Sequence, residues 1–196
     1  MGDRIKVIMD CDPGIDDGIA LAYAAAHQDE LELLAVTTFA GNNTIDKVTK
    51  NALELVDFYG LNVPVARGQE RPLVKEVLHA EEFHGETGLG HCVLPEAKSE
   101  AASDNAVFFI REILDDLPEG QQVTFIETAP MTNLALLLRV FPEVKDKIRR
   151  IVFMGGAVKG GNVTPAAEFN IYADPEAAKI VFEAGIPLVM CGLDAR

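Results

Sequence analysis

The chain has 196 residues, of which 48% are hydrophobic, and its formal net charge is −14. This length suffices for one α/β domain with a buried core, and the hydrophobic fraction predicts a folded globule. The negative charge argues against a nucleic acid polymer as a partner, because proteins that bind DNA or RNA present a basic surface to the phosphates. No signal-peptide pattern, membrane-length apolar run or paired cysteine spacing is present, so we expect a cytoplasmic protein with no membrane partner.

Short apolar segments alternate with amphipathic helical patterns along most of the chain. The predicted strands cover residues 5–11, 31–39, 63–66, 122–127, 149–154 and 187–191, and the predicted helices cover residues 17–27, 44–59, 104–117, 131–141 and 175–184. Continuous apolar strands separated by helices predict an α/β fold: an open, mostly parallel, Rossmann-like sheet with helices on both faces. We find no linker or internal repeat, so residues 1–196 are expected to form a single domain.

Unusual polar loops follow five of the predicted strands. They are the segment after residue 11, "FAGNN" (39–43), "ETAPMTN" (127–133), the stretch 154–170 and "CGLDAR" at the end. Ligands of open parallel sheets bind beyond the carboxyl ends of the strands, so this convergence predicts a functional site at that edge. The connection 67–103 is also longer than a structural loop needs, and its glycine-rich part, 84–90, is expected to be mobile.

Four aspartates stand within "MDCDPGIDDG" (9–18): Asp10, Asp12, Asp16 and Asp17. No Lys or Arg lies between Lys6 and Lys47 to balance their charge, so a bound divalent cation is the favoured interpretation, and carboxylate oxygens select Ca²⁺ or Mg²⁺. A purely structural alternative places Asp16 at a helix N-cap and Asp17 in the first helical turn. That alternative leaves Asp10 and Asp12, at the end of a buried strand, without an explanation.

Weaker signals lie elsewhere. The D-x-D after the first strand is also typical of metal-dependent phosphatases of the haloacid dehalogenase type. His79, His84 and His91 have no familiar zinc-ligand spacing, and "GGAVKGG" lacks the ending of a phosphate-binding loop. In "ADPEAA", Asp174 and Pro175 are read as the N-cap and first residue of a helix, without a chemical role.

Five motifs, in order, resemble those of the calcium-dependent nucleoside N-ribohydrolases, the inosine-uridine nucleoside hydrolases. They are "DCDPGIDD" (10–17), "VTTFAGN" (36–42), "FHGETGLG" (83–90), "TAPMTNLA" (128–135) and the long tract "FMGGAVKGGNVTPAAEFNIYADPEAAKIVF" (153–182). The resemblance spans residues 5 to about 194 with similar spacing between motifs. Each motif alone is a weak signal, and it is their order that makes the resemblance specific.

The resemblance implies a role for each aspartate of the cluster. Asp12 would bind Ca²⁺ and act as the base that deprotonates the attacking water. Asp17 and the backbone carbonyl of Thr128 would be further calcium ligands, Asp16 would hold ribose hydroxyls, and Asp10 would support the site from behind. The residues implied to line the substrate pocket are Asn42, His84, Met154, Asn162, Glu168 and Asn170.

The implied reaction is hydrolysis of the N-glycosidic bond of purine or pyrimidine ribonucleosides to ribose and free base. The resemblance also implies a small-molecule ribonucleoside as partner and a homo-oligomer as the assembly. The family carries a C-terminal part beyond the matched residues, with a late His–Asp pair of which the Asp binds calcium. Without those helices, we expect apolar sheet surface to be exposed. Two alternatives stay open: a catalytically impaired protein or subunit that binds ribose or nucleosides, and a metal-dependent phosphatase.

Overall fold

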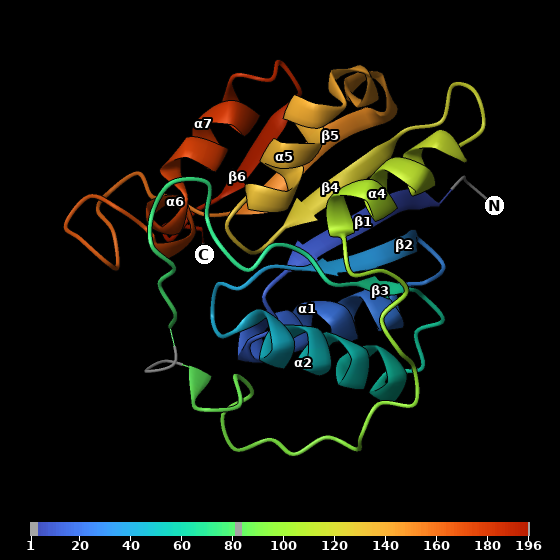
Figure 1. Cartoon of the computed structure of the whole chain (residues 1–196), viewed down its shortest axis with the longest axis horizontal. Helices are drawn as coiled ribbons and strands as arrows, with labels where there is room; N and C mark the ends of the chain where they lie inside the picture. The colour runs from blue at the N-terminus through green and yellow to red at the C-terminus, as the bar shows by residue number, and fades with distance from the viewer. Residues whose placement is uncertain (1–3, 81–83, 196) are drawn as a thin grey trace.

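The fold is built on a parallel β-sheet, seen in a computed structural model that describes residues 4–80 and 84–195 (Figure 1). Phe83, part of the glycine-rich motif, lies outside the described residues. Within them, six strands pair in the order β3-β2-β1-β4-β5-β6, all parallel. The strands are β1 (Ile5–Cys11), β2 (Leu31–Thr38), β3 (Val65–Ala66), β4 (Val123–Glu127), β5 (Ile148–Met154) and β6 (Leu188–Cys191). The predicted fold class is confirmed.

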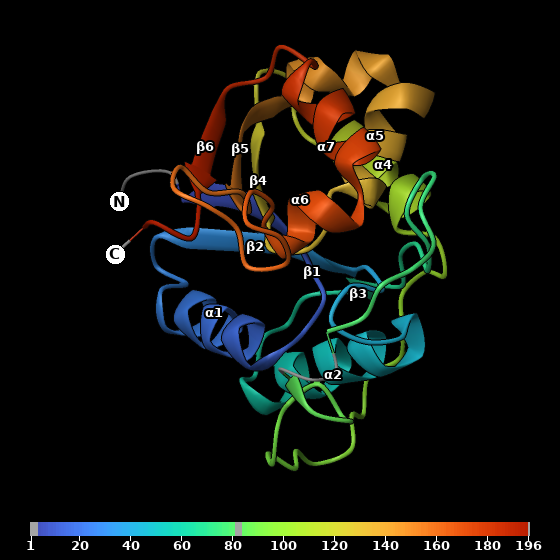
Figure 2. The ribbon, with the colours of Figure 1, turned by 90° about the vertical axis from the view of Figure 1, so that its left-hand side faces the viewer.

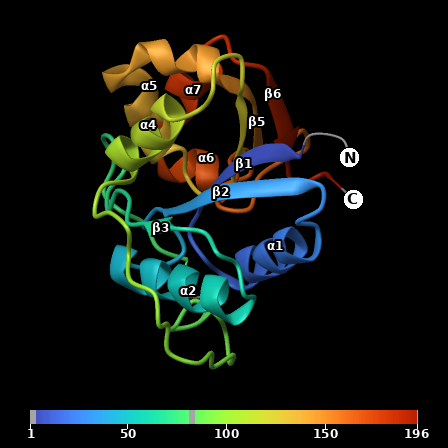
Figure 3. The ribbon, with the colours of Figure 1, turned by 90° about the vertical axis from the view of Figure 1, so that its right-hand side faces the viewer.

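Helices lie on both sides of this sheet, as Figures 2 and 3 show. On one side are α1 (Ile15–Ala26) and α2 (Ile45–Phe58). On the other are α4 (Ala106–Asp115), α5 (Thr132–Val140) and α7 (Pro175–Phe182), with the short α6 (Phe169–Ala173) beside the site. None of the described helices is both long and apolar enough to cross a membrane.

The larger core lies between the sheet and helices α4, α5 and α7. Ile8, Phe125 and Ile151 contribute from three neighbouring strands, and Ile110 and Leu134 from the helices that cover them; all are fully buried. Alternate residues of each strand point to the same face, which explains why the apolar pattern of the strands supplies this core. A second core joins β1, β2 and β3 to α1 and α2.

The face that carries α1 and α2 is covered over only part of its width. The second core contains β1, β2 and β3 residues, whereas Val189 of β6, which points to this face because Leu188 packs on the opposite one, is 43% exposed. Helix α1 likewise exposes Ile15, Ile19 and Tyr23, which recur at a spacing of four residues along one side. The expected exposure of apolar surface is therefore found, at the β6 end of the sheet and on α1.

Helix α1 begins two residues earlier than the N-cap interpretation of Asp16 requires, so that interpretation was wrong. The N-cap is Gly14, whose extended backbone donates its N–H to the Asp17 carboxylate at 3.3 Å. Asp16 is the second residue of the helix and points its carboxylate outward. A carboxylate at the third helical position can accept the N–H of the N-cap residue, as in a capping box. This hydrogen bond explains why the Asp17 side chain points back toward Gly14.

Two short helical elements were missed from the sequence: α6 and the 3₁₀ helix Pro142–Lys147. The start of α7 was predicted correctly. Asp174 is its N-cap and accepts the Ala177 N–H at 3.0 Å, with Pro175 next. The same buried carboxylate also accepts the Thr132 hydroxyl at 2.7 Å and the Leu73 N–H at 2.9 Å. Asp174 therefore joins α7, α5 and the 67–103 connection.

Replacing Asp174 with alanine should lower the free energy of unfolding by about 3 kcal/mol, because three buried donors lose their acceptor at once. Urea denaturation measures this change. Asp116→Ala removes an exposed carboxylate at the end of α4 and is the matched control, with an expected effect below about 0.5 kcal/mol. Equal losses in both variants would contradict the joining role of Asp174.

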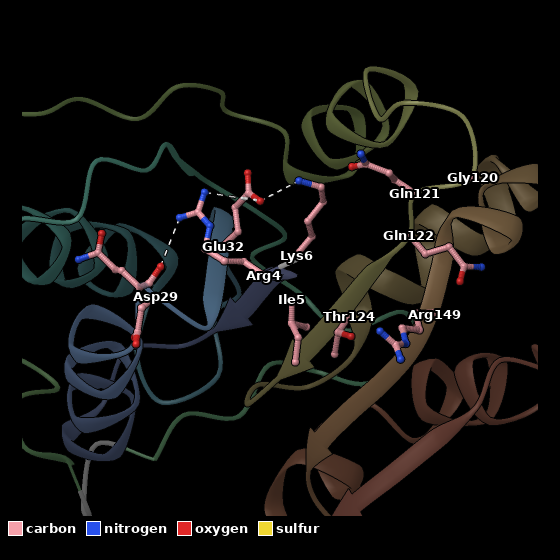
Figure 4. Close-up of a pocket in the computed structure, with 11 residues that line it drawn as sticks. Arg4, Ile5, Lys6, Asp29, Glu32, Gly120, Gln121, Gln122, Thr124 and Arg149 are labelled. Carbon is pink, nitrogen blue, oxygen red and sulfur yellow. Dashed lines mark hydrogen bonds and ion pairs between the residues drawn. The ribbon is translucent and has the colours of Figure 1, made fainter. Parts of the chain in front are cut away.

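A hollow of about 760 Å³ opens at the amino ends of the strands, opposite the predicted site (Figure 4). It is polar, and its charges are largely compensated. Lys6 and Arg4 both reach Glu32, at 2.8 and 3.7 Å, and the hydrogen bond from Lys6 is the main cause that lowers the pKa of Glu32. None of the sequence-predicted site residues lines this hollow.

Candidate active site

A cavity of about 300 Å³ lies at the carboxyl edge of the sheet, where the predicted polar loops converge. Its walls come from the segment after β1, the loop after β2, the 67–103 connection, the loop after β4 and the long loop after β5. The lining residues are Asp12, Asp16, Asn42, Ala80, His84, Thr128, Met154, Asn162, Val163, Glu168, Phe169 and Asn170. The cavity lies where an open parallel sheet normally binds its ligand.

Asp12 forms the floor of this cavity. Its carboxylate accepts the backbone N–H of Asn42 at 2.8 Å, and its backbone carbonyl accepts the Asn42 side-chain amide at 2.9 Å. The loop after β2 approaches so closely that a Cβ at Gly41 would lie 2.0 Å from the Asp12 carboxylate. Glycine at position 41 is thus needed for the two loops to meet, and their contact fixes the direction of Asp12.

Asp12 and Asp17 are two carboxylates buried next to each other, 1% and 2% exposed. Burial raises the pKa of Asp17 to about 7, assisted by the charge of Asp16. Burial, followed by the charge of Asp17, raises the pKa of Asp12 well above its usual value. Two ionised carboxylates in this setting need a neutralising cation, and oxygen donors of this kind suit Ca²⁺. The residues present therefore fit such an ion.

Behind Asp12 lies a network centred on the fully buried Asp10. Its carboxylate accepts the Thr37 hydroxyl at 2.5 Å and the Asn133 side-chain amide at 2.9 Å, while burial raises its pKa to about 6. Glu127 is also fully buried, and burial and the neighbouring Asp10 raise its pKa well above the usual value. Burial and the neighbouring carboxylate therefore both favour the protonated form of Glu127.

The opposite wall is held by Glu168 and Asn170. The Glu168 carboxylate accepts three backbone N–H groups, from Gly156, Asn170 and Ile171, at 2.9 to 3.2 Å, and so caps α6. The Asn170 amide nitrogen donates to the carbonyls of Thr128 and Met154, at 2.9 and 3.0 Å. Because this nitrogen is bonded to the main chain, the amide oxygen of Asn170 is the atom left to accept a ligand hydroxyl.

His84 closes one side of the cavity. Its ring packs against Gly14, where a Cβ would lie 2.5 Å from Nδ1, and Nδ1 is 3.9 Å from the Asp16 carboxylate. That nitrogen is buried and makes no hydrogen bond within the described structure. The side chain therefore presents an unused polar atom next to the aspartate-rich segment.

Comparison with known proteins identifies the type of site. The family model of the inosine-uridine preferring nucleoside hydrolases matches residues 7–196. The chain belongs to this family. The pyrimidine-specific ribonucleoside hydrolases RihA of Salmonella typhimurium and Photobacterium profundum are 50% and 51% identical to it over 191 and 189 residues, which are 97% and 96% of this chain.

Solved structures of nucleoside hydrolases show the same fold. The purine-preferring ribonucleoside hydrolase from Gardnerella vaginalis superposes with a TM-score of 0.89 at 36% identity, and covers 96% of this chain. The chain spans about 60% of the length of the relatives it matches, 60% of each of the two RihA proteins and 61% of the Gardnerella structure.

The structure brings together most of the residues that the nucleoside hydrolase motifs predict for the site. All of them line the cavity except Asp17, which is buried beside Asp12, and Asp10, which lies behind both. Their individual roles stay predictions. Sequence reasoning missed Ala80, Val163 and Phe169, whose apolar side chains carry no chemical signature.

In the described part of the chain, no group of three or more His, Cys, Asp or Glu side chains is placed to hold a metal ion. Asp12 and Asp17 make a pair, and the third predicted donor, Thr128, is a backbone carbonyl, which such a grouping does not include. The zinc interpretation of the histidines gains no support, since His79 instead lies 3.3 Å from the Gly41 carbonyl and His91 is exposed.

The metal-free chain should lose stability as the pH rises from about 4 to 7. The folded protein holds a proton on Asp17 up to about pH 7, and the pKa of Asp12 is also raised, whereas the unfolded chain releases both protons near pH 3.8. The native state thus binds more protons than the unfolded state in this range, so the free energy of unfolding falls with pH. Urea denaturation in the presence of a chelator measures the slope.

Asp12→Asn removes one of the buried carboxyl groups whose pKa is raised and should make this pH dependence less steep. Asp46→Asn, which changes an exposed aspartate on α2, should leave it as in the wild type. An unchanged slope in Asp12→Asn would show that the buried pair does not titrate as the structure indicates.

Proposed function

We propose that this chain binds Ca²⁺ and a ribonucleoside in the 300 Å³ cavity, and that its aspartate-rich floor hydrolyses the N-glycosidic bond to give ribose and free base. The observation that carries the proposal is the joint placement of a buried carboxylate pair and a polar, hydroxyl-accepting wall around one cavity. Membership of the nucleoside hydrolase family supports the reaction type.

The reaction needs a water molecule to attack the anomeric carbon of ribose while the bond from that carbon to the base nitrogen breaks. Asp12, which lines the cavity, would take a proton from the attacking water, and the hydrogen bond from the Asn42 N–H holds its carboxylate in place. The leaving base takes up a proton as it departs. Positive charge develops on the ribose ring in the transition state, and the acidic side chains around the cavity stabilise it.

Calcium would be held by the carboxylates of Asp12 and Asp17 and by the Thr128 carbonyl. That carbonyl accepts a hydrogen bond from Asn170 and keeps a second lone pair for an ion. When bound, the ion neutralises the carboxylate pair, lowers the pKa of a coordinated water and orients sugar hydroxyls. The hydrogen bond from Asn42 and the contact with Gly41 hold Asp12 in place with or without it.

The opposite wall would bind the ribose. Asp16, Asn42, Asn162, Glu168 and Asn170 offer acceptors and donors to vicinal hydroxyls, and a deoxyribose would leave some of these buried groups unpaired. Met154 would pack against the sugar, and His84 would lie beside the base. We further propose that the protein acts in cytoplasmic ribonucleoside catabolism and assembles as a homo-oligomer, as the sequence suggests.

The test is release of free ribose from uridine and inosine, with and without a chelator. The proposal expects ribose release that needs Ca²⁺ and that Asp12→Asn abolishes. Nucleoside binding without turnover would contradict catalysis by this chain and support the alternative of an impaired nucleoside-binding protein. Hydrolysis of a phosphate ester but not of nucleosides would support the phosphatase alternative.

A further inference from the structure

Asn51 is a buried polar side chain that none of the motifs singled out. It lies in the middle of α2 and is 4% exposed. Its amide nitrogen donates to the carbonyl of Pro13 at 3.1 Å and to the carbonyl of Thr87 at 2.8 Å. Pro13 belongs to the segment that carries Asp12, Asp16 and Asp17, and Thr87 belongs to the loop that carries His84. One amide group thus joins two walls of the cavity.

The loop is fitted closely to Asn51. Gly88 has a φ of +90°, and a Cβ there would lie 2.9 Å from the Asn51 amide nitrogen. Two further α2-side donors reach the same loop: the Asn43 amide and the Lys47 ammonium both donate to the Glu86 carbonyl, at 3.1 and 2.7 Å. The attachment therefore follows one side of α2.

The loop that carries His84 is also held by a hydrogen bond within itself. Gly90 donates its N–H to the His84 carbonyl at 2.8 Å, so the position of residues 86–88 determines the position of His84. Leu89 is buried in the core that α1 and α2 share. His84 in turn packs on Gly14, next to Pro13. A shift of Thr87 away from Asn51 would therefore move His84 away from the aspartate segment.

We propose that Asn51 is a positioning residue that holds the His84 loop against the aspartate-rich segment and thereby sets the affinity of the site for the base part of a nucleoside. This inference rests on the proposed function only for the identity of the ligand. The coupling between Asn51 and the loop is a property of the free protein, and it can be measured without any ligand.

Hydrogen–deuterium exchange of the peptide covering residues 84–91 tests the coupling. Asn51→Asp keeps the size of the side chain but places an oxygen against two carbonyls. We expect the amides of the loop to exchange at least about tenfold faster in this variant, which corresponds to the loss of about one hydrogen bond. Gly88→Ala perturbs the same contact from the loop side and should give the same result. Asn105→Asp adds an equal charge at the α4 N-cap, where either residue caps well, and should not change the loop.

Calorimetric binding of uridine and of ribose tests the functional part. Asn51→Asp should weaken uridine about tenfold while ribose changes less than about threefold, because ribose makes no use of His84. Unchanged loop exchange, or equal losses for uridine and ribose together with a lower melting temperature, would overturn the inference. If the wild type binds neither compound, the proposed function fails, and the exchange data alone decide whether Asn51 positions the loop.

Discussion

Asp12→Asn is expected to abolish the stabilisation that Ca²⁺ gives the wild-type protein. At a free Ca²⁺ concentration of about 100 times Kd, a ligand specific for the native state adds about 2.7 kcal/mol. For a domain of this size, that corresponds to a rise in melting temperature of about 5–10 °C. In the variant the rise should vanish, and calorimetry of Asp12→Ala should show Ca²⁺ affinity lowered by more than about 100-fold.

The same substitution should act in the opposite direction when no calcium is present. Asp12→Asn removes one of two buried like charges, and the asparagine oxygen can still accept the N–H of Asn42. In chelator at pH 8 the variant should therefore be more stable than the wild type. Asp16→Asn is the informative comparison, because it should retain Ca²⁺ binding and lose ribose affinity. Unchanged calcium affinity in Asp12→Ala would show that the metal assignment is wrong.

Asn133→Leu should be the most destabilising of the substitutions considered, at about 4 kcal/mol. Asn133 is fully buried, donates to the Asp10 carboxylate and to the Thr38 carbonyl, both at 2.9 Å, and accepts the Gln69 N–H at 2.9 Å. Leucine is similar in volume but removes all three hydrogen bonds. The Asn133 side chain therefore connects four parts of the fold: β1, β2, α5 and the 67–103 connection.

Urea denaturation of Asn133→Leu gives the measurement, with Asn105→Ala as the control. Asn105 is the N-cap of α4, so its replacement should cost about 1 kcal/mol. A loss no greater than that of the control would mean that Asn133 contributes only local hydrogen bonds. A Cβ at Gly68 would lie 2.4 Å from the Asn133 amide nitrogen. This close packing indicates that Asn133 also fixes the 67–103 connection, so that its loss should cost more than local hydrogen bonds.

Elements with a regular apolar period were predictable from the sequence. The strand positions followed from continuous apolar runs of strand length, because these strands are covered on both faces, and the helix positions followed from the 3.6-residue repeat, because one face of each helix is buried. Helix α6 was missed because Phe169–Ala173 is too short to show a period, and it starts at the Glu168 cap rather than at a common capping residue. The cap of α1 was misassigned because glycine carries no side-chain signal at an N-cap.

The site was predictable where its residues belong to recognisable motifs, and hidden where they act through distant partners. Asn133 and Asn51 look like ordinary polar positions on helices, since nothing in the sequence shows that they donate to oxygen atoms 36 to 123 residues away. Glu127 reads as the polar end of a strand, although it is fully buried beside Asp10. Such contacts depend on which strands become neighbours, which only the folded sheet decides.

The incomplete cover near β6 has a consequence for how copies of this chain behave in solution. In the part of the chain that the structure describes, β6 pairs with β5 alone, so its other edge offers unpaired N–H and C=O groups next to exposed Val189 and Met190. Such an edge can accept a strand from another molecule. The charge of −14 keeps copies apart, but salt screens this repulsion beyond about 8 Å at physiological ionic strength. Ionic strength should therefore control colloidal stability, with dispersed molecules in dilute buffer and edge-to-edge association in concentrated salt.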